Sequence, residues 1–260
     1  MSFSTEEENG VPFCLVKGGP SDGEIIYLTV PDLYQSKQSV VKKECVKYIE
    51  TEAGKFFQIP NEKTRSILIA GPAGSGKSTY VMNYATMWKK LNPESRIVLF
   101  SKIVDDPSLE GLEVQRVYLT EDLVKSPLEI EDVKENTMVI FDDCDALSSK
   151  NLANSIYQFQ MQLLELGRHY NIQVVITSHL IVGTRSQLQA RTILNEMNCL
   201  TVFPGSGSAA QIKFALTKYF GMTTKQIRAI QDLKSRWVTL VKVYPQFVIS
   251  EHECIFVSEL

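Results

Sequence analysis

Two patterns of apolar and polar positions alternate along this chain. Short, almost wholly apolar runs have the length and the β-branched content of buried strands. These runs lie at residues 65–70, 96–101, 113–119, 137–141, 171–179 and 199–203. Residues 80–91 and 152–170 instead repeat apolar side chains at helical spacing, and residues 121–125 form a shorter helical stretch. The alternation predicts an α/β fold with a central, mostly parallel sheet flanked by helices.

Further elements are predicted on both sides of this core. After a loose acidic tail at residues 1–10, two strand-like runs at 11–17 and 23–30 predict a β-hairpin. Residues 35–52 are predicted to form a helix with one apolar side, made of Val41, Cys45, Tyr48 and Ile49. The C-terminal elements are expected to be helices at 208–220 and 223–234 and strands at 236–243, 247–249 and 254–257. The predicted parts are an N-terminal segment (1–60), a core (61–205) and C-terminal helices and strands packed on that core (206–260).

Composition places the chain among ordinary globular proteins. It has 260 residues, of which 44% are hydrophobic and 22% charged, and its net charge is −3. This balance argues against a uniformly basic protein that coats nucleic acid, although a local basic lining inside an oligomer would not show in the total. The five cysteines are scattered without a C-x-x-C pair, which indicates reduced thiols in a cytosol-like compartment. The start of the chain lacks a signal-peptide core and no apolar run approaches ~18 residues, so we expect no membrane span.

The strongest chemical signal is the segment Gly-Pro-Ala-Gly-Ser-Gly-Lys-Ser-Thr at residues 71–79. It fits G-x-x-x-x-G-K-[ST] and stands between a predicted buried strand and a predicted helix, as a P-loop does. Its backbone N–H groups and the start of the helix are suited to wrap phosphates. We expect Lys77 to reach the β- and γ-phosphates of a nucleotide and the Ser78 hydroxyl to ligate Mg²⁺. The expected nucleotide-binding residues are Gly71, Pro72, Ala73, Gly74, Ser75, Gly76, Lys77, Ser78 and Thr79.

Two carboxylates follow the apolar run at residues 137–141, in the form of a Walker B element. We assign Asp142 to hold Mg²⁺ through water, and Asp143 to orient and deprotonate the attacking water. Many hydrolytic P-loop ATPases have a glutamate where Asp143 stands, so this shorter acid requires the water to lie closer. Asp145 is predicted to cap the start of the next helix.

At least one predicted strand lies between the two motifs along the chain. In the branch of P-loop ATPases that uses an acid beside Walker B, such a strand is inserted between the P-loop strand and the Walker B strand, and we expect this RecA-like order here. Small GTPases and most nucleoside kinases lack the insertion, and the chain has no N/T-K-x-D guanine signature. ATP is therefore the expected nucleotide.

Polar residues at later element ends are candidates for completing the site. His179 ends the run at 171–179 and is predicted to report the nucleotide state as a sensor, with a surface histidine as the alternative. Arg191 is either an arginine finger acting across a subunit boundary or part of a surface salt bridge. Arg168 and His169 are equally compatible with a role in the site and with capping a helix C-terminus by charge–dipole attraction.

Two loops and two helices are candidates for contact with DNA. Loops 102–111 and 180–189 follow strand ends on the predicted nucleotide face, and they contain Lys102 and Arg185. The C-terminal helices are locally basic, which indicates either a solvated face or a DNA-binding surface. Their basic residues are Lys213, Lys218, Lys225, Arg228, Lys234 and Arg236.

With these residues in place, the chain resembles the genome-packaging ATPases of the nucleocytoplasmic large DNA viruses. This poxvirus-type group belongs to the FtsK/HerA superfamily of P-loop NTPases. The Walker motifs alone identify only a P-loop ATPase, and the later Gly-Arg-His, Thr-Ser-His and Arg-Thr-Ile-Leu-Asn-Glu blocks are more specific. The resemblance covers roughly residues 60–240 and rests on residues 71–79, 99–109, 140–143, 167–172, 176–179 and 191–196.

The resemblance implies an ATP-hydrolysing, Mg²⁺-dependent motor that forms a homo-oligomeric ring, either a pentamer or a hexamer. Such a motor translocates double-stranded DNA into a preformed capsid, with capsid or portal components as partners. It would act in the cytoplasm of the infected host cell, in the virus factory, with the virion as a second location. The resemblance also favours Arg168 and Arg191 as arginine fingers, and His179 as the sensor where relatives often have glutamine.

Two other functions remain open from the sequence. A nucleotide or nucleoside kinase also needs a P-loop and a mobile lid that bears arginine, a role open to Arg185 and Arg191. A nucleotide-gated assembly switch would bind ATP without pumping DNA, and Asp143 in place of glutamate leaves that function open. Phosphate transfer to a small acceptor would indicate the kinase, and tight ATP binding without turnover would indicate the switch.

Overall fold

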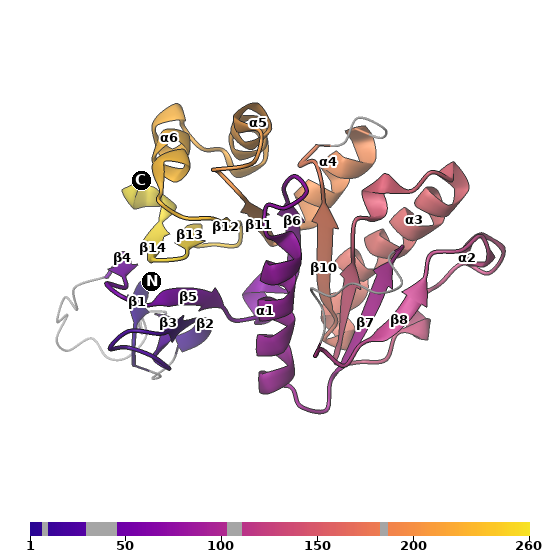
Figure 1. Cartoon of the computed structure of the whole chain (residues 1–260), viewed down its shortest axis with the longest axis horizontal. Helices are drawn as coiled ribbons and strands as arrows, with labels where there is room; N and C mark the ends of the chain where they lie inside the picture. Colours follow the sequence, from indigo (N-terminus) through magenta and orange to yellow (C-terminus); the bar gives the residue numbers. More distant parts are fainter. Residues whose placement is uncertain (7–9, 30–45, 103–110, 183–186) are drawn as a thin grey trace, which may run out of the picture.

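A computed structural model describes residues 1–6, 10–29, 46–102, 111–182 and 187–260 of the chain (Figure 1). Its main sheet has ten strands in the order β4-β14-β13-β12-β11-β6-β10-β9-β7-β8. The parallel strands are β6 (Ser66–Ala70), β7 (Arg96–Ser101), β8 (Gln115–Tyr118), β9 (Thr137–Phe141), β10 (Gln173–Ser178) and β11 (Cys199–Val202). Antiparallel strands extend the sheet beyond β11, namely β12 (Val238–Val241), β13 (Phe247–Ser250), β14 (Glu253–Phe256) and β4 (Tyr48–Glu50).

The order of the strands explains how the two predicted motifs meet. Strand β10 lies between the P-loop strand β6 and the Walker B strand β9, and it is parallel to both. The predicted RecA-like order and the α/β class are therefore confirmed. One detail of the prediction was wrong: strands β7 and β8, which lie between the motifs along the chain, continue the sheet beyond β9. The inserted strand comes after Walker B in the sequence.

Helices cover both faces of this sheet. The α-helices are α1 (Lys77–Leu91), α2 (Asp122–Lys125), α3 (Lys150–Leu166), α4 (Gln187–Glu196), α5 (Ala209–Phe220) and α6 (Thr224–Asp232). Short 3-10 turns lie at η1 (Glu62–Thr64), η3 (Ile130–Asp132), η4 (Cys144–Ala146), η5 (Gly167–Tyr170) and η6 (Val257–Glu259). None of the helices in the described part of the chain is long and apolar enough to cross a membrane.

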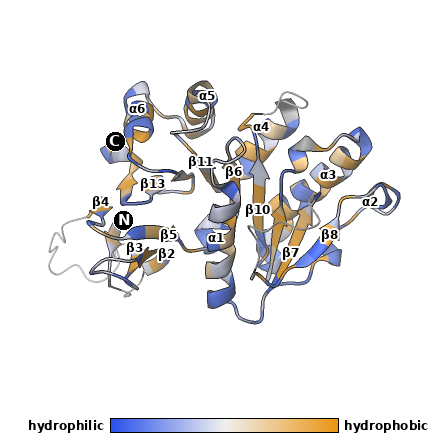
Figure 2. Cartoon of the chain, viewed as in Figure 1, coloured by the Kyte–Doolittle hydropathy of each residue, from blue (hydrophilic) through white to orange (hydrophobic). Residues whose placement is uncertain are grey.

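Side chains at alternate positions of the buried strands pack into two separate hydrophobic cores. In β6, Leu68 and Ala70 pack in one core with residues of α3, α5 and α6, whereas Ile67 and Ile69 pack in the other with α1. This follows from the two-residue period of a strand, because successive side chains point to opposite faces. Hydrophobic residues accordingly concentrate on the central strands (Figure 2). A strand buried on both faces appears in the sequence as a continuous apolar run, as observed.

A second, smaller sheet packs beside the C-terminal strands (Figure 1). Its order is β1-β3-β2-β5, with β1 (Ser2–Ser4), β2 (Gly10–Lys17), β3 (Ile25–Thr29) and β5 (Lys55–Gln58). The hairpin of β2 and β3 confirms the predicted N-terminal hairpin. The prediction of a loose tail was wrong for Ser2–Ser4, because these residues pair with β3 and bury Phe3.

The predicted helix at residues 35–52 was wrong where the structure describes it. Tyr48–Glu50 form the edge strand β4, which pairs with β14. Strand pairing supplied by a distant part of the chain overrides the helical spacing of Tyr48 and Ile49. Val41 and Cys45, which completed that spacing, lie outside the described residues.

Candidate active site

The P-loop connects β6 to α1 at the carboxyl edge of the sheet. The Gly71 N–H donates to the Ser178 carbonyl at the end of the neighbouring strand β10, at 3.0 Å. Gly74 and Gly76 have φ angles of +76° and +110°, a region that disfavours any residue with a side chain. Gly76 is the N-cap of α1 and provides no side-chain cap. The first N–H groups of α1 therefore remain open to an anionic ligand.

Lys77, the first residue of α1, is buried against this loop. Only 7% of its surface is exposed, and its Nζ donates to the Gly71 carbonyl at 3.0 Å. Nζ also lies 3.8 Å from Asp143 Oδ1. The ammonium group is thus already directed across the loop toward the Walker B acids.

Thr177, near the end of β10, holds both Walker B acids. Its hydroxyl donates to Asp142 Oδ1 at 2.8 Å and accepts the backbone N–H of Asp143 at the same distance. Asp142 is 8% exposed and also accepts a long hydrogen bond of 3.5 Å from the Ser101 hydroxyl of β7. The inserted strand therefore fixes the position of the acids relative to the P-loop.

Asp143 adopts a backbone conformation that is uncommon for its residue type. Its φ angle is +46°, in the left-handed region that Asp and Asn tolerate better than most side chains. This turn lies between β9 and η4, and it brings the Asp143 carboxylate within reach of both Lys77 and His179. This turn was not predictable from the sequence pattern, because the residue with the positive φ is an aspartate and not a glycine.

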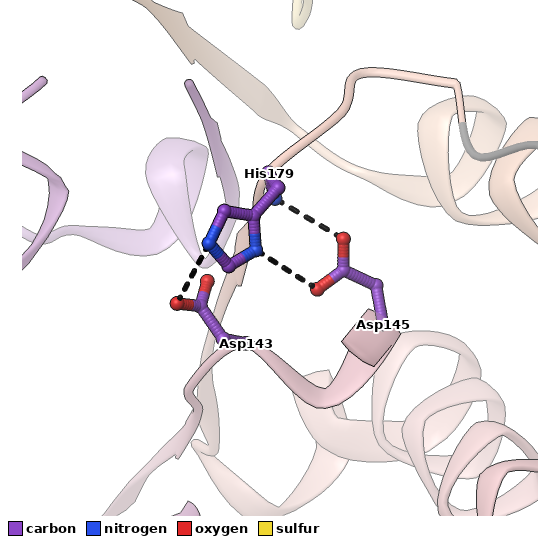
Figure 3. Close-up of side chains that lie close together, drawn as sticks. All are labelled: Asp143, Asp145 and His179. Atoms are coloured by element: carbon purple, nitrogen blue, oxygen red, sulfur yellow. Dashed lines mark hydrogen bonds and ion pairs between the residues drawn. The ribbon is translucent and has the colours of Figure 1, made fainter. Parts of the chain in front are cut away.

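His179 lies between two carboxylates (Figure 3). Its Nε2 is 3.5 Å from Asp143 Oδ2, and its Nδ1 is 3.8 Å from Asp145 Oδ1. Asp145 Oδ2 also accepts the His179 backbone N–H at 3.1 Å and the Ser178 hydroxyl at 2.8 Å. Asp145 therefore holds the end of β10 and orients the imidazole toward Asp143.

Two residues of this constellation had other or no predicted roles. Asp145 does not cap the next helix, because the N-cap of α3 is Ser149, whose hydroxyl accepts the Leu152 N–H. The sequence pattern assigns no role to Thr177. Its role depends on β10 lying next to β9, and strand neighbours cannot be deduced from apolar periodicity.

Cys144, between the acids, is not a candidate nucleophile. Burial raises the pKa of its thiol well above the ordinary value, and the charges of Asp142 and Asp145 raise it further. Its Sγ points toward the carbonyls of Phe100 and Asp142. The thiol is a packing group beneath the site.

Among the predicted arginine residues, Arg168 lies apart from this cluster. Arg168 and His169 belong to η5, just before β10 begins, at the edge of the parallel strands opposite the P-loop. The Arg168 guanidinium donates to the His169 ring at 3.3 Å. Arg191 is exposed on α4, and Arg185 lies outside the described residues. Within one chain, the structure brings together Lys77, Asp142, Asp143 and His179, whereas Arg168 lies at the other edge of the parallel strands.

The oxygen groups beside the P-loop suit a small, hard cation. The Ser78 hydroxyl in the first turn of α1 and the Asp142 carboxylate at the end of β9 are the expected ligands, and both offer the oxygen atoms that Mg²⁺ prefers. Asp143, Asp145 and His179 also place ligand atoms within 4.8 Å of one another. The contacts among these three account for their clustering, and we assign no separate cation to them.

No family model matches the chain. The uncharacterized protein V3 of Sputnik virophage is 36% identical over 253 residues, which cover 97% of this chain and 98% of V3. Among solved structures, the genome packaging NTPase B204 from Sulfolobus turreted icosahedral virus 2 aligns with 73% of this chain and 97% of its own, at 11% identity and a TM-score of 0.49. The pCW3 conjugation coupling protein TcpA aligns with 95% of this chain and 77% of its own, at 13% identity and a TM-score of 0.42. Likeness of this size to solved structures assigns no function. The sequence match does assign a family: this chain, with its P-loop NTPase fold, belongs to the family of the Sputnik virophage protein V3.

Proposed function

We propose that this protein is an ATP-hydrolysing motor that translocates double-stranded DNA and packages a viral genome into its capsid. The observation that carries the hydrolytic part is the convergence of Lys77, Asp143 and His179 at the P-loop, with Asp142 fixed beside them. These side chains come from three neighbouring elements, α1, the end of β9 and the end of β10. A glycine-rich turn without chemistry would not require a buried lysine directed at a carboxylate.

In this mechanism, backbone N–H groups of residues 71–79 bind the triphosphate and Lys77 contacts its β- and γ-phosphates. Ser78 and Asp142 would hold Mg²⁺, which neutralises charge on the phosphate oxygens when bound. Asp143 orients a water molecule for attack on the γ-phosphorus and accepts its proton. The oxygen of the water forms the new bond to phosphorus as the bond to ADP breaks, so ADP and phosphate are released.

The contact between His179 and Asp143 gives the site a means of sensing its occupancy. Because Lys77 and His179 both face the Asp143 carboxylate, a phosphate that attracts Lys77 changes the balance of charge around that acid. Asp145 contacts both the ring and the backbone N–H of His179, so we expect a shift of the ring to move the start of the loop after β10. We assign His179 the role of sensor on this basis.

The position of Arg168 favours a site shared between subunits. An arginine at the opposite edge of the sheet cannot reach the nucleotide of its own chain, so a role as arginine finger requires a second copy. Arg191, exposed on α4, is the other candidate. A homo-oligomeric ring is therefore part of the proposal, with ATP bound at the subunit boundaries.

The DNA part of the proposal rests on the resemblance of the Gly-Arg-His, Thr-Ser-His and Arg-Thr-Ile-Leu-Asn-Glu blocks to packaging ATPases. Helices α5 and α6 add exposed basic side chains that suit a phosphate backbone. These side chains are Lys213, Lys218, Lys225 and Arg228. Lys102 is also exposed, beside the part of its loop that lies outside the described residues.

Displacement of a third strand from a DNA triplex tests translocation directly. The full-length protein is mixed with linear DNA that carries the triplex at increasing distances from the end, with ATP or with a non-hydrolysable analogue. We expect displacement only with ATP, after a lag that grows with distance, and none with Lys77→Ala. Turnover without displacement but with phosphate transfer to a nucleoside would replace the motor with a kinase. Tight binding without turnover would replace it with a switch.

A further inference from the structure

A cavity lies beside the P-loop, on the side away from the Walker B acids. It has a volume of about 210 Å³, and Gly76 and Thr79 line the end nearest the P-loop. Its walls come from α1, from β5, from the segment before β12 and from Glu251 in the turn between β13 and β14. Its lining includes Thr79, Asn83, Arg236, Trp237 and Glu251.

The direction of the bound triphosphate brings its nucleoside toward this cavity. Lys77 and Asp143 lie on the side of β10 and β9, so the γ-phosphate must face those strands. On the other side of β6 the sheet continues with β11 and β12 (Figure 1). The α-phosphate and the nucleoside therefore extend past Gly76 toward the segment that precedes β12.

The outer wall of the cavity is held firmly in place. The Arg236 backbone N–H donates to Glu251 Oε2 at 2.7 Å, and Glu251 Oε1 pairs with Lys55 Nζ at 3.0 Å. The Trp237 ring packs edge-on against the Tyr80 ring of α1, with a centroid distance of 4.9 Å. These contacts tie the segment before β12 to both α1 and β5, so the wall is built before any ligand arrives.

The Arg236 side chain is free to meet a ligand in this cavity. Its Cδ would lie 3.6 Å from a Cβ built on Gly76, so the side chain runs over the end of the P-loop. The residue is exposed, and its guanidinium makes no hydrogen bond or ion pair with any other residue in the described part of the chain. A planar guanidinium beside an indole ring is suited to stacking on a nucleobase.

We propose that this cavity binds the nucleoside part of the nucleotide, with Arg236 and Trp237 as the residues that contact it. The proposal rests on the proposed ATP site and adds the part that distinguishes a nucleotide from inorganic phosphate. It also assigns Arg236 to the nucleotide site and not to the basic surface of α5 and α6. The polar groups of Thr79 and Asn83 on α1 are placed to bond the ribose or the edge of the base.

Binding of ATP and of inorganic tripolyphosphate, measured side by side by calorimetry, tests this assignment. We expect Arg236→Ala and Trp237→Ala to weaken ATP binding about tenfold and to leave tripolyphosphate binding within twofold of the unmodified protein. Lys234→Ala, which removes an exposed charge two positions away, is the matched control and should change neither affinity. Lys77→Ala should weaken both ligands.

The outcomes separate this inference from the proposed function. Equal ATP affinity in the unmodified protein and in both variants would overturn the nucleoside site while leaving the P-loop assignment intact. Equal loss of ATP and tripolyphosphate binding in Arg236→Ala would overturn it as well, because Arg236 would then contact phosphate. Failure of the unmodified protein to bind either ligand would overturn both the proposed function and this inference.

Discussion

At the scale of single residues, the chemistry of the site depends on a few side chains that take no direct part in it. Thr177 is buried, and its hydroxyl is the common partner of Asp142 and of the Asp143 backbone. Asp145 plays the same part for His179. These groups fix the reacting groups in place before the nucleotide binds, which reduces the cost of ordering them in the transition state.

Removing the Thr177 hydroxyl should impair both turnover and stability. Thr177→Val leaves the buried Asp142 carboxylate and the Asp143 N–H without this partner, which costs about 1–3 kcal/mol of unfolding free energy. We expect kcat for ATP hydrolysis to fall at least about tenfold. Thr177→Ser keeps the hydroxyl and should retain most of both properties. Similar kcat values for the valine and serine variants would show that the acids are held in some other way.

Removing the Asp145 carboxylate should slow hydrolysis without weakening nucleotide binding. Asp145→Ala frees the His179 ring and backbone, so we expect about a tenfold loss in kcat with an unchanged Kd for ATP. Asp145→Asn keeps one acceptor oxygen, so its kcat should lie between those of Asp145→Ala and the unmodified protein. The measurement is steady-state phosphate release together with equilibrium binding. If Asp145→Ala hydrolysed ATP at the normal rate, Asp145 would not be needed to orient His179 for hydrolysis.

At the scale of elements, the strands and helices that carry the motifs were predictable, and their neighbours were not. Buried strands such as β6 and β9 appear as apolar runs, and the glycines of the P-loop mark the turn between β6 and α1. Pairings between distant segments, such as β4 with β14, leave no local signal. The roles of Thr177, Asp145 and Arg236 depend on such neighbours, which explains why sequence patterns did not assign them.

The link between Glu251 and the segment before β12 should make stability depend on pH. Burial of the Glu251 carboxylate raises its pKa, but the Arg236 N–H and the Lys55 ammonium outweigh burial and hold the pKa below its ordinary value of 4.5. A depressed folded pKa means that this stabilisation is present above pH 4.5 and is lost as the pH falls through the folded pKa.

Glu251→Gln should therefore lower the free energy of unfolding at neutral pH, and the difference from the unmodified protein should vanish in acid. Urea unfolding of both proteins, followed from neutral pH to below pH 4.5, measures this difference. Because other carboxylates titrate equally in both proteins, their contribution cancels. A difference that is constant across this range, or that grows in acid, would contradict the assigned charge pairing.

At the scale of the whole molecule, the two ends of the chain stabilise each other. Phe3 of β1 stacks on Phe256 of β14 with a centroid distance of 4.4 Å, and Phe13 of β2 meets Phe247 of β13 at 5.1 Å. All of these rings are buried in the core that α1 also contacts. We expect the N-terminal sheet and the ATP site to unfold together, while the division at residues 60 and 205 stays a prediction.

Truncating one ring of this cluster tests the coupling. Phe13→Ala should lower the free energy of unfolding by about 3–5 kcal/mol, because it leaves a cavity between the two sheets. Phe214→Ala, at a 38% exposed ring on α5, should cost less than about 1 kcal/mol and serves as the control. Circular dichroism and nucleotide binding should report the same midpoint in both variants. Separate midpoints would mean that the N-terminal sheet unfolds on its own.

We expect this P-loop site to couple ATP hydrolysis to movement along DNA. This coupling is tested by steady-state ATPase activity with and without long double-stranded DNA, in the unmodified protein and in Asp143→Asn. Asparagine suits this control because it also tolerates the positive φ of +46° while lacking the basic carboxylate. We expect turnover to rise with DNA and to disappear in Asp143→Asn. Turnover that is indifferent to DNA, or that survives in Asp143→Asn, would contradict it.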